Sequence, residues 1–257
     1  MTNSIIKSQN IGDGTQIGPF CVIGENVKIG KNCKIYNHVT IDGYTTIGDN
    51  VTIFSYAAVG NVPQHLKYKG EKTELIIGDN NIIREFAMIN PGVGENGKTI
   101  IGNNNLLMAY THIAHDCIIG NNCILANCAT LGGHIEIGDY VNIGGMTGIH
   151  QFVKVGNGSM IAGASALGQD IPPYCTAEGN RATIRGLNRH RMRQLLDSKE
   201  IDEISRVYKI LLSGKAPIKE LAEIELNNAK LDSIKFICRF ILDSKRGIPY
   251  KRGVINE

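Results

Sequence analysis

Aliphatic residues recur at every sixth position over the first two thirds of the chain. Counted in sixes from Ile5 to Leu167, 25 of 28 positions are Ile, Leu or Val. The next residue is often Gly, the third residue after the aliphatic is often Asn, and the fourth is small or β-branched. A period of six fits neither the 3.6-residue turn of an α-helix nor the alternation of a plain strand. It fits a short strand followed by a tight turn, in which Gly or Asn tolerates a positive φ.

This repeat predicts a parallel β-helix. The aliphatic side chains point inward, and three hexads close one triangular coil. Successive coils then stack at the inter-strand spacing of about 4.8 Å. We therefore expect a mainly β fold over residues 1–179, built as a parallel β-helix of hexapeptide repeats.

Two segments interrupt the repeat. His65 and Glu71 stand at aliphatic positions in a polar stretch near residues 62–73, and Glu95 does so in a Gly-rich stretch near residues 91–99. We predict that both are loops leaving the solenoid. Loops on a rigid scaffold often carry function.

The repeat stops at Pro172-Pro173, and helical patterns follow. Asp197 and Glu200 have the spacing of a capping box, and Pro217 suits a first helical turn. Apolar residues then recur at spacings of three and four. The sequence predicts an α-helical domain over residues 180–257 that covers the open end and flank of the solenoid.

Charge divides the chain at the same place. Residues 1–179 carry a net charge of −4 and residues 180–257 carry +7. The run from Arg181 to Arg193 holds five Arg without interleaved aromatic residues, which argues against a nucleic-acid platform. Arg side chains match phosphate geometry, so a diphosphate or an acidic partner protein fits the run better. A solvated helix face is the alternative.

The composition indicates an intracellular, non-membrane protein. The first seven residues contain no apolar run of signal-peptide length, and no stretch approaches the ~20 apolar residues of a membrane span. The odd number of Cys, seven, indicates reduced thiols rather than a disulfide framework. We expect a cytoplasmic protein without stable membrane insertion.

A coil of three hexads also predicts which residues stack. Residues 112–116, 132–134 and 150–151 fall at one corner on successive coils, which gathers four of the seven His within roughly 10 Å. Protonating several close imidazoles costs energy, so stability does not call for such a cluster. We interpret it as a site.

The residues of this corner suit proton-transfer chemistry. His transfers protons near neutral pH, and Asp116 can orient the His115 ring and stabilise its protonated form. Gly133, one coil from His115, has no side chain to block its backbone N–H, which can then meet an oxyanion.

Zinc is the main alternative, because three His can bind it with an open position for water. The Cys residues do not support a metal site, since they occupy the small fourth place of their hexads and are predicted to pack in the core: Cys21, Cys33, Cys117 and Cys123. The chain has no P-loop, dinucleotide fingerprint or nucleophile elbow. We expect no metal.

Several motifs together resemble one family. They are His112-Ile113-Ala114-His115-Asp116-Cys117, Cys123-Ile124-Leu125-Ala126-Asn127, Ile149-His150-Gln151-Phe152, Gln169-Asp170-Ile171-Pro172-Pro173-Tyr174 and Glu178-Gly179-Asn180. With the hexads and the helical tail, they resemble the UDP-N-acetylglucosamine O-acyltransferases of lipid A biosynthesis. The resemblance runs nearly end to end.

The resemblance implies a left-handed coil and a cytoplasmic homotrimer with active sites between subunits. It implies transfer of an (R)-3-hydroxyacyl group from acyl carrier protein to the glucosamine 3-position of UDP-N-acetylglucosamine, the first step of lipid A biosynthesis. No metal or dissociable cofactor is implied beyond the phosphopantetheine arm of the carrier protein.

The resemblance also implies residue roles. His115 would be the general base, Asp116 would support it, and the Gly133 amide would stabilise the thioester oxyanion. The implied sugar or diphosphate contacts are His112, His134, His150 and Gln151. The implied nucleotide or donor contacts are Gln64, Lys67 and Asn188, and the implied acyl-chain pocket involves Met160, Gly163 and Arg181.

The chain departs from the family pattern at three places. His65 replaces the acid of a loop that often reads Gln-Asp-Leu-Lys. Arg181 stands where a His is common, so the acyl-chain length is not readable. Arg193-Gln194-Leu195-Leu196 replaces an Arg-Arg-Gly-Phe run to which nucleotide contacts are assigned.

Three other functions fit the sequence less well. A zinc lyase of the carbonic anhydrase type needs no anion-binding domain, so the basic tail argues against it. The sister N-acyltransferase would carry a uridine-binding domain before the repeat, whereas hexads begin here by Ile5. A non-catalytic scaffold leaves the four stacked His unexplained. The sequence does not distinguish a 3-hydroxyl from a 3-amino acceptor, since both would use the same base and oxyanion donor.

Overall fold

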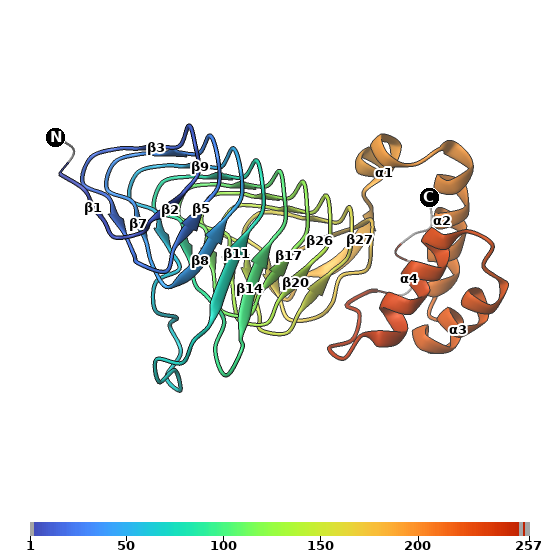
Figure 1. The fold of residues 1–257 in the computed structure, drawn as a ribbon. Coiled ribbons are helices and arrows are strands. Elements are labelled where there is room, and N and C mark those ends of the chain that lie inside the picture. The colour runs from blue at the N-terminus through green and yellow to red at the C-terminus, as the bar shows by residue number, and fades with distance from the viewer. Residues whose placement is uncertain (1–2, 252–253, 255–257) are drawn as a thin grey trace.

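The computed structural model describes residues 3–251 and 254. Short strands stacked in parallel form the three faces of a prism, and the helices lie beyond its C-terminal end (Figure 1). Each coil passes once through each face, because the three sheets take strands in turn along the chain. The predicted parallel β-helix is therefore confirmed.

The three faces are named sheets A, B and C. Sheet A contains, in spatial order, β1 (Ile5–Ile6), β4 (Val22–Ile23), β7 (Thr40–Ile41), β10 (Ala58–Val59), β13 (Met88–Ile89), β16 (His112–Ile113), β19 (Thr130–Leu131), β22 (Gly148–Ile149) and β25 (Ala166–Leu167). Sheet B contains β2 (Asn10–Ile11), β5 (Lys28–Ile29), β8 (Tyr44–Ile47), β11 (Glu74–Ile77), β14 (Lys98–Ile101), β17 (Ile118–Ile119), β20 (Glu136–Ile137) and β23 (Lys154–Val155). Sheet C contains β3 (Gln16–Ile17), β6 (Lys34–Ile35), β9 (Thr52–Ile53), β12 (Ile82–Ile83), β15 (Leu106–Leu107), β18 (Ile124–Leu125), β21 (Asn142–Ile143), β24 (Met160–Ile161), β26 (Cys175–Glu178) and β27 (Thr183–Leu187).

The strand register follows the hexads. Ile113 pairs with Leu131, and Leu131 pairs with Ile149, which is the predicted step of three hexads. Val59 instead pairs with Ile89, and Ile89 pairs with Ile113. These two coils are longer because they contain the loops expected near residues 62–73 and 91–99.

Aliphatic and small side chains fill the prism. The inward Ile, Leu and Val residues of the central coils are almost fully buried, and the Cys residues at the fourth hexad place pack beside them. The Cys117 thiol donates a hydrogen bond to the Gly132 carbonyl at 3.1 Å. Burial raises the pKa of Cys117 to about 12, so this thiol stays protonated and serves as a packing group.

The C-terminal segment starts as β-structure before it becomes helical. β26 continues sheet C and pairs antiparallel with β27, so the expected boundary between residues 179 and 180 falls inside a hairpin. The helices are α1 (Arg189–Leu195), α2 (Ser198–Leu211), α3 (Ile218–Asn228) and α4 (Asp232–Asp243). The hairpin was missed because its strands lack the six-residue repeat.

Local signals place the helices. Asp197 caps α2 by accepting the Glu200 N–H at 2.9 Å, as predicted. Pro217 is the residue before α3 rather than part of its first turn. The Tyr208 hydroxyl donates to the Pro173 carbonyl at 2.6 Å, which attaches α2 to the last coil. None of the helices within residues 3–251 combines the length and apolar character needed to cross a membrane.

The three corners of the prism carry different side chains. At the corner between sheets C and A, the aromatic rings of Phe20, His38, Tyr56, Phe86 and Tyr110 stack with centroids 4.8–5.1 Å apart. This ladder was not predicted.

At the corner between sheets A and B, both loops leave the coil, and they project from the same side of the prism (Figure 1).

Candidate active site

The predicted histidine cluster lies at the corner between sheets A and B. His115 follows β16, Gly133 follows β19 and Gln151 follows β22, so they occupy equivalent places on successive coils. The His134 N–H donates to the His115 carbonyl at 3.0 Å, and the Phe152 N–H donates to the Gly133 carbonyl at 3.1 Å. The repeat thus stacks residues that are three hexads apart, as the sequence predicts.

His115 and Asp116 form a hydrogen-bonded pair. The His115 side chain is 6% exposed, and its Nδ1 lies 2.8 Å from Asp116 Oδ2. The Asp116 carboxylate also accepts the Val93 N–H at 3.1–3.2 Å, from the loop after β13. A carboxylate only accepts hydrogen bonds, so Nδ1 carries the proton and Nε2 of the neutral ring has a free lone pair.

Gly133 faces the Nε2 side of the His115 ring. A Cβ atom at Gly133 would lie 2.7 Å from Nε2 and 2.5 Å from Cε1. No side chain fits here without displacing His115. The Gly133 N–H has no hydrogen-bond partner among residues 3–251, so it is available to a ligand that approaches Nε2.

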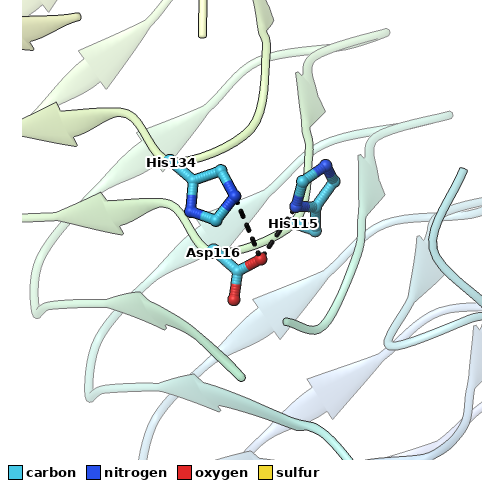
Figure 2. A group of neighbouring side chains, drawn as sticks. All are labelled: His115, Asp116 and His134. Carbon is cyan, nitrogen blue, oxygen red and sulfur yellow. Dashed lines mark hydrogen bonds and ion pairs between the residues drawn. The ribbon is translucent and has the colours of Figure 1, made fainter. Parts of the chain in front are cut away.

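Two further imidazoles flank His115. The His134 ring meets it edge-to-face at 5.1 Å and stacks on Phe152 at 4.7 Å. His134 Nε2 lies 3.7 Å from Asp116 Oδ2, so one carboxylate oxygen is near both rings (Figure 2). His65, from the loop near residues 62–73, meets His115 edge-to-face at 4.8 Å.

A groove of about 860 Å³ runs along sheet A beside this corner. Its volume suits a ligand larger than a single sugar. Seven of the predicted site residues line it: Gln64, His112, His115, Gly133, His150, Gln151 and Arg181. Burial, followed by the charge of His115, lowers the pKa of His112, which favours a neutral ring inside the groove.

The other predicted residues lie outside the groove. Asp116 and His134 do not line the groove and lie beside it, at the corner between sheets A and B, and Lys67 is exposed on its loop. Asn188 caps α1 by accepting the Arg191 N–H at 3.2 Å, and its Nδ2 donates to the Gly158 carbonyl at 2.8 Å.

Met160 and Gly163 lie on another face of the prism. Met160 belongs to sheet C, where it pairs with Asn142 and Thr176, and Gly163 follows the same strand. The groove lies along sheet A, so one chain does not bring these residues to it.

The geometry fits proton transfer better than zinc binding. Donor atoms of His115, Asp116 and His134 lie within 4.8 Å of one another. Ligands at about 2.0–2.1 Å from a tetrahedral zinc ion are separated by about 3.3 Å. The 2.8 Å between His115 Nδ1 and Asp116 Oδ2 is instead a hydrogen-bond distance.

Asn90 is a groove residue that the sequence analysis missed. It follows β13, lines the groove near His112 and is 2% exposed. The available signal was its position, because Asn90 follows an inward Ile where Gly is common in the repeat.

Family models match both halves of the chain. The bacterial transferase hexapeptide model matches residues 10–43 and 98–133, and the model described as Udp N-acetylglucosamine O-acyltransferase, domain 2, matches residues 170–249. The fold and the histidine corner therefore define a hexapeptide-repeat transferase.

Individual relatives narrow the class. The chain is 60% identical over 195 residues to the acyl-[acyl-carrier-protein]–UDP-N-acetylglucosamine O-acyltransferase of Helicobacter pylori strain P12, covering 75% of this chain and 72% of that protein. It is 55% identical over 198 residues to the enzyme of that name from Nautilia profundicola, covering 76% of each chain.

Solved structures agree over almost the whole chain. A crystal structure of UDP-N-acetylglucosamine acyltransferase matches with a TM-score of 0.95 and 58% identity over 98% of both chains. The acyltransferase from Campylobacter jejuni matches with a TM-score of 0.93 and 49% identity over 98% of this chain and 99% of that one. This chain belongs to the UDP-N-acetylglucosamine O-acyltransferase family and is an acyltransferase with the expected left-handed β-helix.

Proposed function

We propose that the protein transfers an (R)-3-hydroxyacyl group from acyl carrier protein to the 3-position of the glucosamine in UDP-N-acetylglucosamine, as the first step of lipid A biosynthesis. The names of its relatives support the two substrates. The observation that carries the mechanism is the pairing of His115 Nδ1 with Asp116, which directs Nε2 toward Gly133.

His115 is the general base of the proposed reaction. Its Nε2 takes the proton of the sugar hydroxyl, and the oxygen attacks the thioester carbonyl carbon. The Gly133 N–H donates to the resulting oxyanion. When the tetrahedral intermediate collapses, the carbon–sulfur bond breaks, and the leaving thiolate takes the proton from the His115 imidazolium. Asp116 stabilises that imidazolium through Nδ1.

The role of His115 as general base is tested by replacing it with Ala. Removing a general base costs about 10²–10⁴-fold, and we expect kcat to fall by at least 10² while the melting temperature is retained. His38→Ala is the control, because His38 stacks between Phe20 and Tyr56 at the corner between sheets C and A, away from the groove. Turnover by His115→Ala close to that of the control would remove His115 from the role of base.

The acceptor atom is determined by analysing the product. Mass spectrometry of the reaction of a UDP-sugar with a mixed pool of 3-hydroxyacyl donors gives the chain length and distinguishes an ester from an amide. We expect an ester. An amide would show that the acceptor is a 3-amino sugar. The proposed roles of His115 as base and of the Gly133 N–H as oxyanion donor would stay the same.

The working unit of the proposed enzyme is a homotrimer. The support is the division of the predicted residues between two faces, since the groove lies along sheet A whereas Met160 and Gly163 belong to sheet C. A neighbouring copy that presents sheet C, with Asn188 at the start of α1, to the groove would complete the acyl-chain pocket and the nucleotide contacts.

Mixed trimers test this arrangement. His115→Ala and Asn188→Ala are each expected to impair turnover. After the two proteins are unfolded together and refolded, random trimers would contain intact sites at about a quarter of the interfaces. Recovery of activity to that level supports a shared site. Activity no higher than the mean of the two variants would place each site within one chain.

The basic C-terminal segment is proposed to attract the carrier protein. Residues 180–257 carry a net charge of +7, and acyl carrier protein fits the acidic partner expected from that charge. Electrostatic association weakens with salt. The KM for the acyl-carrier-protein donor should therefore rise with ionic strength more steeply than the KM for an acyl-phosphopantetheine fragment.

A further inference from the structure

One buried polar atom in the groove has no partner. The side chain of Asn90 donates from Nδ2 to the Asn61 carbonyl at 3.4 Å. Its Oδ1 has no hydrogen-bond partner among the described residues, and Asn90 as a whole is 2% exposed. The orientation of the amide is determined, because the Asn61 carbonyl only accepts and must face the NH₂ group.

Such an atom is costly and uncommon. An unpaired buried acceptor loses its hydrogen bonds to water without replacement, and more than about 90% of buried polar groups are paired. The same fold pairs its other buried Asn residues. Asn105 Nδ2 donates to the Gly120 carbonyl at 3.0 Å, and its Oδ1 accepts the Cys123 N–H at 2.7 Å. The unpaired oxygen at Asn90 therefore points to a ligand.

The position of Asn90 in the groove indicates which substrate supplies the donor. The Asn90 N–H donates to the Ile113 carbonyl, so Asn90 lies one coil before His115. Gly133 lies one coil beyond His115, and the thioester must meet its N–H. Further along the same direction the groove is lined by exposed residues with little or no side chain, which leave room for an acyl chain: Gly148, Ala166 and Gly168. The acyl donor thus occupies one side of the base, and the other side is left for the sugar.

We propose that Asn90 Oδ1 accepts a hydrogen bond from a hydroxyl or amide N–H of the acceptor sugar and so helps to select that sugar. This inference rests on the proposed function. Gln64 and His112 line the same end of the groove, so Asn90 adds an acceptor that only a hydrogen-bond donor on the ligand can satisfy.

The experiment is steady-state kinetics of Asn90→Ala in the full-length protein. We expect the KM for UDP-N-acetylglucosamine to rise about tenfold, equal to 1.4 kcal/mol. We expect kcat and the KM for the acyl donor to change less than twofold. Calorimetric titration of UDP-N-acetylglucosamine should show the same loss of affinity without turnover. The melting temperature should change little, since the substitution removes an unpaired buried oxygen together with one long hydrogen bond, from Nδ2 to the Asn61 carbonyl at 3.4 Å.

Two matched variants separate ligand binding from folding. Asn105→Ala removes a paired buried amide, so it should lower the melting temperature and leave the KM values unchanged. Asn61 Oδ1 is also buried without a described partner, but Asn61 does not line the groove. Asn61→Ala should therefore leave the KM for the sugar unchanged.

Three results would overturn the proposal. They are an unchanged KM for the sugar in Asn90→Ala, a rise only in the KM for the acyl donor, or dissociation of the oligomer with unchanged KM values, which would mean that a neighbouring copy pairs Oδ1. If the unmodified protein neither binds nor acylates UDP-N-acetylglucosamine, the proposed function itself fails. An active protein with an unaffected Asn90→Ala variant rejects the role of Asn90 alone.

Discussion

Two corners of the prism share one backbone repeat but use their polar groups differently. At the corner between sheets B and C, each of six side chains accepts the backbone N–H of a residue on the preceding coil, at 2.7–3.1 Å. We call this set the Asx ladder: Asp49, Asp79, Asn103, Asn121, Asp139 and Asn157. The fold thus uses the Oδ1 of every side chain in the ladder.

The corner between sheets A and B leaves polar groups unpaired. His115 Nε2, the Gly133 N–H and Asn90 Oδ1 have no hydrogen-bond partner within the described part of the chain. These groups face one groove, or lie next to it. Asn105, by contrast, is buried in the coils and paired at both Nδ2 and Oδ1. We interpret the unpaired groups beside the groove as the places where a ligand completes the pairing.

Among the variants that compare the two corners, Gly133→Ala is expected to cause the largest loss of kcat. The new Cβ would overlap the His115 ring, displacing the base and covering the Gly133 N–H. We expect kcat to fall about 10³-fold, the upper end of the loss for one oxyanion donor, because the base moves as well. The measurement is kcat together with the melting temperature.

Gly186→Ala is the matched control. Its Cβ would have only Thr176 Oγ1 nearby, at 3.7 Å, an ordinary contact. This variant should keep full activity. Equal kcat values for Gly133→Ala and Gly186→Ala would show that the histidine corner does not carry the reaction.

Asp116→Asn should have the next largest effect. Both carboxylate oxygens approach the Val93 N–H, and Oδ2 also accepts His115 Nδ1–H. An amide that keeps its oxygen toward Val93 turns its NH₂ toward Nδ1, which moves the ring proton to Nε2. We expect kcat to fall about 10²-fold with less than a twofold change in the KM for the sugar.

Asp139→Asn is the same chemical change in the Asx ladder. Its Oδ1 accepts the Asn121 N–H at 2.7 Å, and an amide oxygen can do the same. Activity should be unchanged. A loss of kcat there as large as at Asp116 would contradict the division of roles between the two corners.

The fold was predictable because one physical rule is repeated in every coil. Ile113, Leu131 and Ile149 each point inward at the same place, so the step of three hexads alone gives their pairing. The hairpin of β26 and β27 lies outside this rule, and its residues gave no periodic signal. The aromatic ladder was missed for another reason, because Phe20 and Tyr56 occupy turn positions at positive φ where Asn was expected.

The site was predictable where it follows the register. Counting three hexads on from His115 and from Asp116 gives Gly133 and His134, and the structure places all four together. The contact of His65 with His115 could not be derived, because His65 belongs to a loop without a repeat. Asn90 was hidden because the loop after Pro91 lengthens the coil, so that Asn90 lies beside Ala114 and not beside the residue three hexads further on.

The Asx ladder should control stability instead of activity. Asp139→Ala removes an acceptor shared by the N–H and Nδ2 of Asn121. A lost hydrogen bond of this kind costs about 0.5–1.5 kcal/mol, which lowers the melting temperature by about 2–4 °C. Calorimetry measures this shift, and kcat should be unaffected. A stable variant with reduced kcat would assign the ladder a part in the reaction.

The smallest effect is expected from His112 as the pH changes. Burial and the charge of His115 lower its pKa in the folded protein, so near and below pH 6.5 the unfolded chain binds a proton that the folded chain does not. Unfolding is then favoured as the pH falls, and above the unfolded pKa the contribution disappears. His112→Gln should therefore flatten the fall in the free energy of unfolding between pH 7 and pH 5, by less than the slope of about 1.4 kcal/mol per pH unit that one proton gives. The dependence near pH 8 should be unchanged. Denaturant titrations at these pH values measure the slope, and equal slopes for the variant and the unmodified protein would show that His112 is protonated as readily in the groove as in the unfolded chain.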